Sequence, residues 1–230
     1  MNIGKANSSC VQLLLDQRIL PALSEVSDLV VVVDSDLRFS HNVNKIVSKA
    51  HKRANLILRC SVTRDILSLT NAFKVYVRPI LEYCSVVWCP HLVKDIDCIE
   101  KVQRRFTKRL PGMNNMTYYQ RLRALGLESL ELRRIRIDLL FTYKIMFGLV
   151  DLNRSDFFEL SATDNRLTRG HRYKLMIPTT KNGVRYNYFS YRAVRVWNIL
   201  PTTVCFNSFS SFKNSLSAEL LTRFCKVNFT

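Results

Sequence analysis

Apolar residues in the first part of the chain follow a strand-like pattern. Val11–Leu15 and Leu29–Val33 are short, partly β-branched apolar runs, which favour β-strands. Asp34-Ser35-Asp36 then has the composition of an Asx-type turn, a common way to end a strand. We therefore expect a small β element in residues 1–39.

The period becomes helical from Ser40, a residue type that often caps a helix N-terminus. Apolar side chains recur at i, i+3, i+4 and i+7 between Val43 and Leu58, which predicts a long amphipathic helix. A second helix is expected from Asp65 through Tyr76, where Pro79 must break or kink it. The helix between Val43 and Leu58 also carries four cations outside its apolar stripe: Lys45, Lys49, Lys52 and Arg53.

The stretch from Asp95 to Gly112 predicts a helix with two contrasting faces. At 100° per residue, its apolar side chains occupy about a third of the circumference; they are Ile96, Ile99, Val102, Phe106 and Leu110. The opposite side is basic and carries Lys101, Arg104, Arg105 and Lys108, with Arg109 nearer the seam. One face should anchor the helix in a core while the other faces water or a polyanion.

The rest of the chain alternates helices with a less regular segment. Short and long helices are expected over Tyr118–Leu125 and Glu131–Gly148, and a final amphipathic helix over Phe209–Phe224. Loops with short strands are expected between Asp151 and Lys181, with strands near residues 173–190. The predicted fold is mainly α, a helical bundle over residues 40–150 followed by a C-terminal region over 151–230. Further candidate cations in these segments are Arg133, Arg134, Arg169, His171, Arg172 and Lys174.

Composition indicates a folded, strongly basic protein. Hydrophobic residues make up 47% of 230 residues, with only six Gly and six Pro, which is too apolar for a disordered chain. The formal net charge is +17, and such an excess repels itself unless anions compensate it. Nucleic acid is the best compensating partner, because phosphate neutralisation dominates this kind of binding. An anionic membrane surface, or a merely basic domain without such a partner, is the alternative reading of charge alone.

Cysteine usage and the opening residues indicate the compartment. The seven cysteines are an odd number in a chain too long to depend on disulfides, and the opening MNIGKANSSC has no apolar signal-peptide core. The longest aliphatic run, Leu29–Val33, is too short to span a bilayer. We expect a soluble nuclear or cytoplasmic protein with reduced thiols and no membrane partner.

Residues for catalysis or metal binding are sparse. The close Asp pairs, at positions 34 and 36 and at 95 and 97, are explained by a strand-ending turn and by the first turn of a helix. No P-loop, GxGxxG or nucleophile elbow is present. A weak zinc-like spacing exists, although structural zinc sites usually have paired short spacings; its members are Cys84, Cys89, His91 and Cys98. No catalytic or metal residue is assigned, and buried thiols are the default for Cys84 and Cys98.

The order of the segments resembles one family. EVSDLVVVVDSDLRFS, IVSKAHKRANLILR, AFKVYVRPILEYCSVVWCP, IEKVQRRFTKRLPG, LESLELRRIRIDLLFTYKI, TRGHRYKL and VWNILP follow one another as in the C-terminal part of a non-LTR (LINE-type, jockey-like) retrotransposon reverse transcriptase. The resemblance spans about Ile3 to Phe212. A small departure is Val30, where the family pattern has Gly, and it bears on a local turn.

The resemblance implies a role in holding nucleic acid. Residues 1–39 would be the end of the palm, 40–150 a thumb-like domain and 151–230 the C-terminal region. The family's aromatic-x-Asp-Asp motif lies upstream of these segments and is absent here, so the chain would be an inactive fragment of an RNA-directed DNA polymerase. Its implied partners are RNA, DNA or an RNA–DNA duplex and the remainder of the polymerase, whose chemistry would need Mg²⁺; this chain would bind no cofactor itself. A decayed pseudogene product and a non-enzymatic nucleic-acid-binding or adaptor module are the alternatives.

Overall fold

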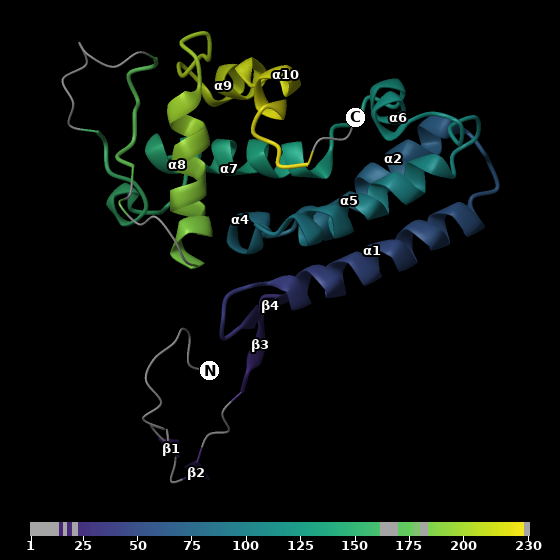
Figure 1. Cartoon of the computed structure of the whole chain (residues 1–230), viewed down its shortest axis with the longest axis horizontal. Coiled ribbons are helices and arrows are strands. Elements are labelled where there is room, and N and C mark those ends of the chain that lie inside the picture. The colour runs from purple at the N-terminus through teal and green to yellow at the C-terminus, as the bar shows by residue number, and fades with distance from the viewer. Residues whose placement is uncertain are drawn as a thin grey trace.

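The computed structural model describes residues 14–15, 18–19, 23–161, 170–177, 179 and 184–227 and is mainly helical, as predicted (Figure 1). Two antiparallel pairs lie at the N-terminal end: β1 (Leu14–Leu15) with β2 (Arg18–Ile19), and β3 (Glu25–Asp28) with β4 (Val31–Asp34). The expected strand over Leu29–Val33 is wrong at its start. Leu29 and Val30 form the turn instead, with φ of 42° and 72°.

The turn after β4 leads directly into the first long helix. The Asp34 carboxylate accepts hydrogen bonds from the backbone N–H groups of Arg38 (2.9 Å) and Phe39 (3.1 Å), which confirms an Asx-type turn here. Helix α1 (Ser40–Cys60) starts one residue earlier than a Ser40 cap would place it, because the cap position is taken by Phe39 in the left-handed conformation. The Ser40 hydroxyl is used elsewhere, since it donates to Asp95 Oδ2 at 2.7 Å.

Four short helices and one long helix follow, of which α2 (Ile66–Tyr76), α5 (Val93–Lys108) and α6 (Tyr118–Ala124) lie where the sequence predicted helices. Helix α2 is capped by Asp65, whose carboxylate accepts from the Ser68 N–H at 2.7 Å. Pro79 lies in the first turn of α3 (Arg78–Glu82), where a missing N–H costs nothing, so the helix is broken before it. Helix α4 (Ser85–Trp88) lies between α3 and α5 in the chain.

The C-terminal part differs more from the prediction. Helix α7 (Leu130–Met146) is followed by the 3₁₀ turns η1 (Arg154–Asp156) and η2 (Val184–Asn187) and then by α8 (Phe189–Ile199). Among the described residues, the strands expected near 173–190 reduce to one antiparallel bridge between Leu160 and Leu175. The single final helix is also wrong: α9 (Phe209–Ser215) and α10 (Ala218–Thr222) are separated, because the Ser217 hydroxyl caps a new helix.

Two hydrophobic cores organise the helices. The first draws on residues between Val31 and Leu130 and packs α1, α2, α3 and α5 around Phe73 and Phe106, whose ring centroids are 4.7 Å apart. The second draws on residues between Leu132 and Leu221 and packs α7, α8, α9 and α10 around Trp197. Helix α7 also contacts α4 and α5, so it is covered from both sides (Figure 1). Several residues at the start of α7 are therefore buried, among them Leu130, Leu132 and Arg134.

Candidate nucleic-acid interface

Helix α1 presents its basic residues on the side opposite its core stripe. Its buried side includes Val43 and Val47, while all four predicted cations are exposed: Lys45, Lys49, Lys52 and Arg53. Within the part of the chain that the structure describes, none of the four forms a salt bridge. A shallow depression of about 530 Å³ follows this side of the helix; it is lined by His41, Asn44, Lys45, Ser48, Lys49 and Lys52.

Helix α5 has the two faces that its sequence predicted, but part of its basic face is neutralised. Lys101 and Arg104 both pair with Asp97, at 3.1 and 3.3 Å. Arg105 and Lys108 are exposed and form no salt bridge with any described residue. The pairing follows from helix geometry, because residues four or seven positions apart lie on the same side.

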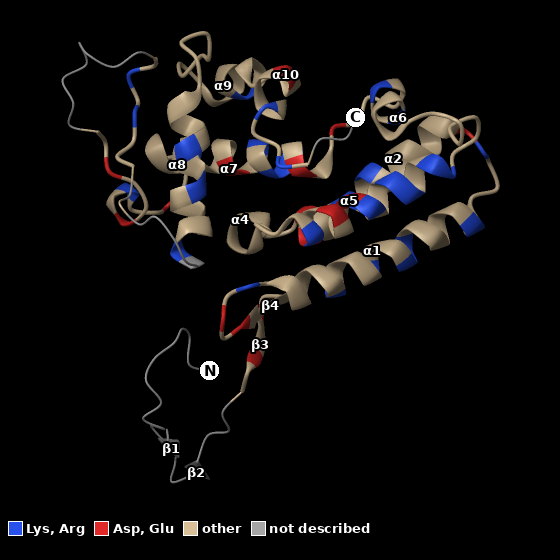
Figure 2. Cartoon of the chain, viewed as in Figure 1, with Lys and Arg blue, Asp and Glu red and all other residues tan. Residues whose placement is uncertain are grey.

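Helices α1 and α5 run parallel and side by side, and Lys and Arg positions are spread along both of them (Figure 2). Two contacts fix the alignment. Ser40 bonds Asp95 near the beginning of both helices, and Arg109 Nη1 donates to Asn55 Oδ1 at 2.6 Å near their ends. His51 lies between them, and its pKa is lowered by burial and then by the nearby Arg105 guanidinium. We call the exposed, unpaired cations of the two helices the α1/α5 basic face; they are Lys45, Lys49, Lys52, Arg53, Arg105 and Lys108.

The predicted cations of α7 do not reach this face. The Arg133 guanidinium forms a two-pronged ion pair with Glu82, with Nη2 3.0 Å from Oε2. Arg134 is 2% exposed, so its predicted position on the surface is wrong. The reason is the placement of α7 between the two cores, which leaves residues at the start of the helix buried or only partly exposed.

The basic tract over residues 168–175 is largely used by the fold. Arg169 lies outside the described residues, and His171 is buried with Nε2 2.8 Å from the Trp197 carbonyl oxygen. The Lys174 ammonium donates to the Asn198 carbonyl oxygen, and burial lowers its pKa. Arg172 alone of the three described cations is exposed; its guanidinium lies 4.8 Å from the Tyr173 ring centroid.

A buried polar network beside α5 was missed by the sequence analysis. Glu100 is fully buried and accepts hydrogen bonds from the Tyr118 hydroxyl (2.5 Å) and the Leu130 N–H (3.0 Å). Burial raises the pKa of Glu100, and the Tyr118 hydrogen bond opposes that rise. Gln103, also fully buried, donates to the same tyrosine oxygen at 3.0 Å. The signal was present, because Gln103 lies within the apolar arc of this helix and Glu100 only about 40° outside it.

The described residues show neither a metal site nor a membrane-spanning helix. Among the described residues, no group of three or more His, Cys, Asp or Glu side chains could hold a metal ion, so the zinc-like spacing from Cys84 to Cys98 does not converge there. The Mg²⁺ of a polymerase centre likewise finds no carboxylate cluster in the described segments. None of the described helices is long and apolar enough to cross a bilayer.

Comparison with known proteins gives one distant relative. The chain is 26% identical over 123 residues to an uncharacterized protein of Caenorhabditis elegans, a match that covers 52% of this chain and 62% of that protein. The chain thus matches less than two thirds of the relative's length. No protein-family model matches the chain. No solved structure is significantly similar to it.

Proposed function

We propose that this chain holds nucleic acid through the α1/α5 basic face, as the thumb and C-terminal part of an RNA-directed DNA polymerase of the non-LTR retrotransposon type. The observation that supports the binding role is the set of exposed, unpaired cations on two parallel, packed helices. The polymerase assignment rests on the order of sequence motifs. The two parts of the proposal therefore have separate tests.

The spacing of the basic face suits a phosphate backbone. Lys45, Lys49 and Lys52 recur about once per helical turn, which is roughly 5.4 Å of rise. A DNA strand carries one phosphate per about 3.4 Å of axis, so each ammonium has a phosphate within reach along the strand. Arg105 and Lys108 on the neighbouring helix widen the contact. Such contacts position a duplex without reading its sequence.

The chain would bind nucleic acid and would not catalyse nucleotide incorporation. Its sequence contains no adjacent Asp pair, and the described residues bring no carboxylates together for two-metal phosphoryl transfer. We expect no nucleotide incorporation by this chain alone, whatever the divalent cation. Metal-dependent primer extension by the purified chain would contradict that expectation.

Fluorescence anisotropy with a labelled RNA–DNA duplex tests the binding role. We expect sequence-indifferent binding with a Kd of roughly 1–100 μM that weakens steeply as salt rises. The test variant reverses four cations of the basic face to Glu: Lys49, Lys52, Arg105 and Lys108. It should lose binding while keeping its circular dichroism.

A control variant separates local contacts from net charge. It reverses four exposed cations that lie away from the basic face: Arg123, Arg154, Lys213 and Arg223. Its net charge equals that of the test variant, so it should retain most of the affinity if the α1/α5 basic face is the interface. Equal losses in the two variants would reduce the interaction to unspecific charge. Equal competition by heparin and by duplex would favour an acidic protein as the partner.

A further inference from the structure

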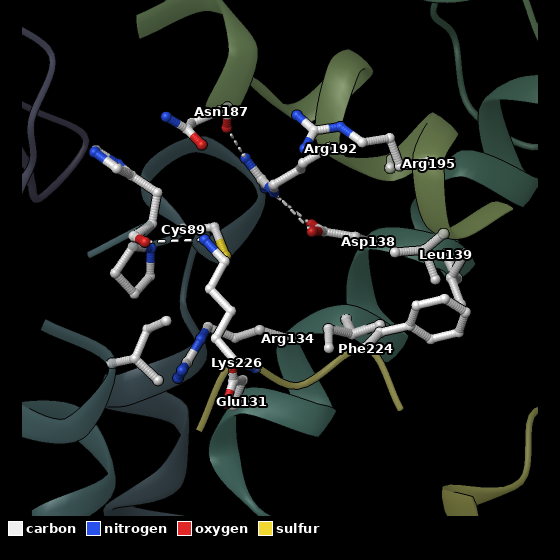
Figure 3. A pocket seen from close by; sticks show the side chains of 16 residues that line it. Cys89, Glu131, Arg134, Asp138, Leu139, Asn187, Arg192, Arg195, Phe224 and Lys226 are labelled. Carbon is white, nitrogen blue, oxygen red and sulfur yellow. Dashed lines mark hydrogen bonds and ion pairs between the residues drawn. The ribbon is translucent and has the colours of Figure 1, made fainter. Parts of the chain in front are cut away.

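A cavity of about 200 Å³ lies where α7, α8, the turn at Cys89–His91 and the segment Phe224–Lys226 meet (Figure 3). It is separate from the α1/α5 basic face. Part of its wall is apolar, including Ile135, Leu139 and Val196. Six Asp, Glu, Lys and Arg side chains also line the cavity, which is unusual for a space between packed helices.

One charged residue of this wall, Arg134, has no hydrogen-bond partner for its Nη atoms, although it interacts electrostatically with the Glu100 and Asp138 carboxylates. Both Nη nitrogens of Arg134 are buried and donate to no hydrogen-bond acceptor among the described residues. In Figure 3, Arg134 lies beside Glu131 and Lys226, across the cavity from Arg192. A buried guanidinium without an acceptor is among the most costly arrangements that a fold can contain.

The nearby carboxylates are already committed to other donors. Glu131 accepts from the backbone N–H groups of Lys226 (2.8 Å) and Val227 (3.2 Å). Asp138 accepts from Arg192 through both carboxylate oxygens, at 2.8 and 2.9 Å. Neither carboxylate makes a salt bridge with Arg134.

The wall of the cavity therefore carries an excess of positive charge. Its cations are Arg134, Arg192, Arg195 and Lys226, and its anions are Glu131 and Asp138, which leaves a formal surplus of two positive charges. Lys226 donates to the His91 carbonyl oxygen at 2.9 Å. An anion is the ligand that these groups lack.

We infer that this cavity binds a small organic oxyanion, a carboxylate or phosphate monoester on a compact apolar body, with Arg134 as its principal partner. A cavity of about 150 Å³ accommodates benzene, so this one admits a body of about that size. The apolar wall would contact the body while Arg134 forms a charge-assisted, forked bond to the oxyanion. Because the Nη atoms are buried, the guanidinium would turn toward the ligand on binding.

Thermal unfolding with benzoate and with phenyl phosphate tests this inference. Both probes carry a phenyl ring and differ in the oxyanion. The comparison therefore separates a carboxylate site from a phosphate site. At matched ionic strength in chloride, at least one should raise the melting temperature in a saturable manner, and neutral benzyl alcohol should not. Arg134→Met should raise the probe concentration needed for half of the maximal shift by at least about tenfold, which is the loss of affinity expected when a charge-assisted hydrogen bond is removed.

Two further variants keep the test decisive. Val196→Phe fills the cavity without touching Arg134 and should abolish the saturable shift even if Arg134→Met fails to fold. Arg154→Met removes an exposed guanidinium far from the cavity and should leave the shift intact. Equal shifts in chloride, benzoate and phenyl phosphate, or an undiminished shift in Val196→Phe, would overturn the inference. This assay contains no nucleic acid. Its result is therefore the same whether or not the proposed nucleic-acid binding is confirmed.

Discussion

The slope of log affinity against log salt should report how many cations of the α1/α5 basic face contact phosphates. Each phosphate neutralised on duplex DNA contributes about 0.9 to the slope of log affinity against log salt. Six unpaired cations therefore predict a slope of about −5, or roughly a thousandfold loss of affinity between about 50 and about 200 mM salt. Removing any two of them should reduce the slope by about 1.8.

Two double variants locate these contacts. Lys49→Gln with Lys52→Gln removes two of the four cations that α1 contributes to the basic face, and Arg105→Gln with Lys108→Gln removes both cations that α5 contributes. Each pair should reduce the slope equally, and the quadruple variant should retain a slope of about −2. The assay is fluorescence anisotropy of a short labelled DNA duplex across the salt series, with the fold checked by circular dichroism.

Arg133→Gln supplies the control for this experiment. Its guanidinium is paired with Glu82, so the salt slope should not change, although the free energy of unfolding should fall by about 1–3 kcal/mol. A slope that responds to the α1 pair and not to the α5 pair would show that the two helices do not act as one surface. A slope that responds to neither pair would refute the basic face as the interface.

Three predictions concern the stability of the fold. Val30→Gly should raise the free energy of unfolding by up to about 1 kcal/mol in urea, because relief of a left-handed Val, about 1–2 kcal/mol, exceeds the entropic cost of Gly; a destabilised variant would contradict the turn geometry. Tyr118→Phe should lower it by about 1–3 kcal/mol, because buried Glu100 loses a charge-assisted hydrogen bond, and an unchanged urea midpoint would argue against that bond. Burial lowers the pKa of His171, so the neutral ring is favoured in the folded state and wild-type stability should fall as the pH drops below about 6.5. His171→Gln should remove that part of the decline, as measured by melting temperature against pH; parallel curves would show that His171 does not titrate on unfolding.

Helix positions and their buried faces could be predicted because amphipathic periodicity is local. In α5 the sequence alone placed Ile99 and Val102 inside and Arg105 and Lys108 outside, and the structure agrees. It also contained the neutralising partner Asp97, four residues before Lys101. The surface of the candidate interface was thus largely accessible to sequence reasoning, whereas its charge was overestimated.

Positions that depend on packing between distant segments could not be predicted in this way. Arg133 and Arg134 follow the same basic pattern as the cations of α1, but α7 lies between two cores, so Arg134 is buried and Arg133 is only partly exposed. At the hairpin, β-branched residues indicated one strand, whereas the pairing of β3 with β4 requires a turn at Leu29 and Val30. Strand propensity gives no information about where a chain must reverse.

The two cores treat positive charge differently, and this difference links folding to binding. Around the second core, arginines serve the fold itself: Arg192 pairs with Asp138, and Arg136 bonds Glu128 and the Leu216 carbonyl oxygen. Around the first core, the lysines of α1 remain exposed without carboxylate partners among the described residues, in a chain of net charge +17. Their mutual repulsion opposes folding, and a polyanion that binds only the folded face relieves it. At a hundredfold excess over its Kd, such a ligand adds about 2.7 kcal/mol to stability. The surface that weakens the isolated chain is therefore the same surface through which nucleic acid would stabilise it.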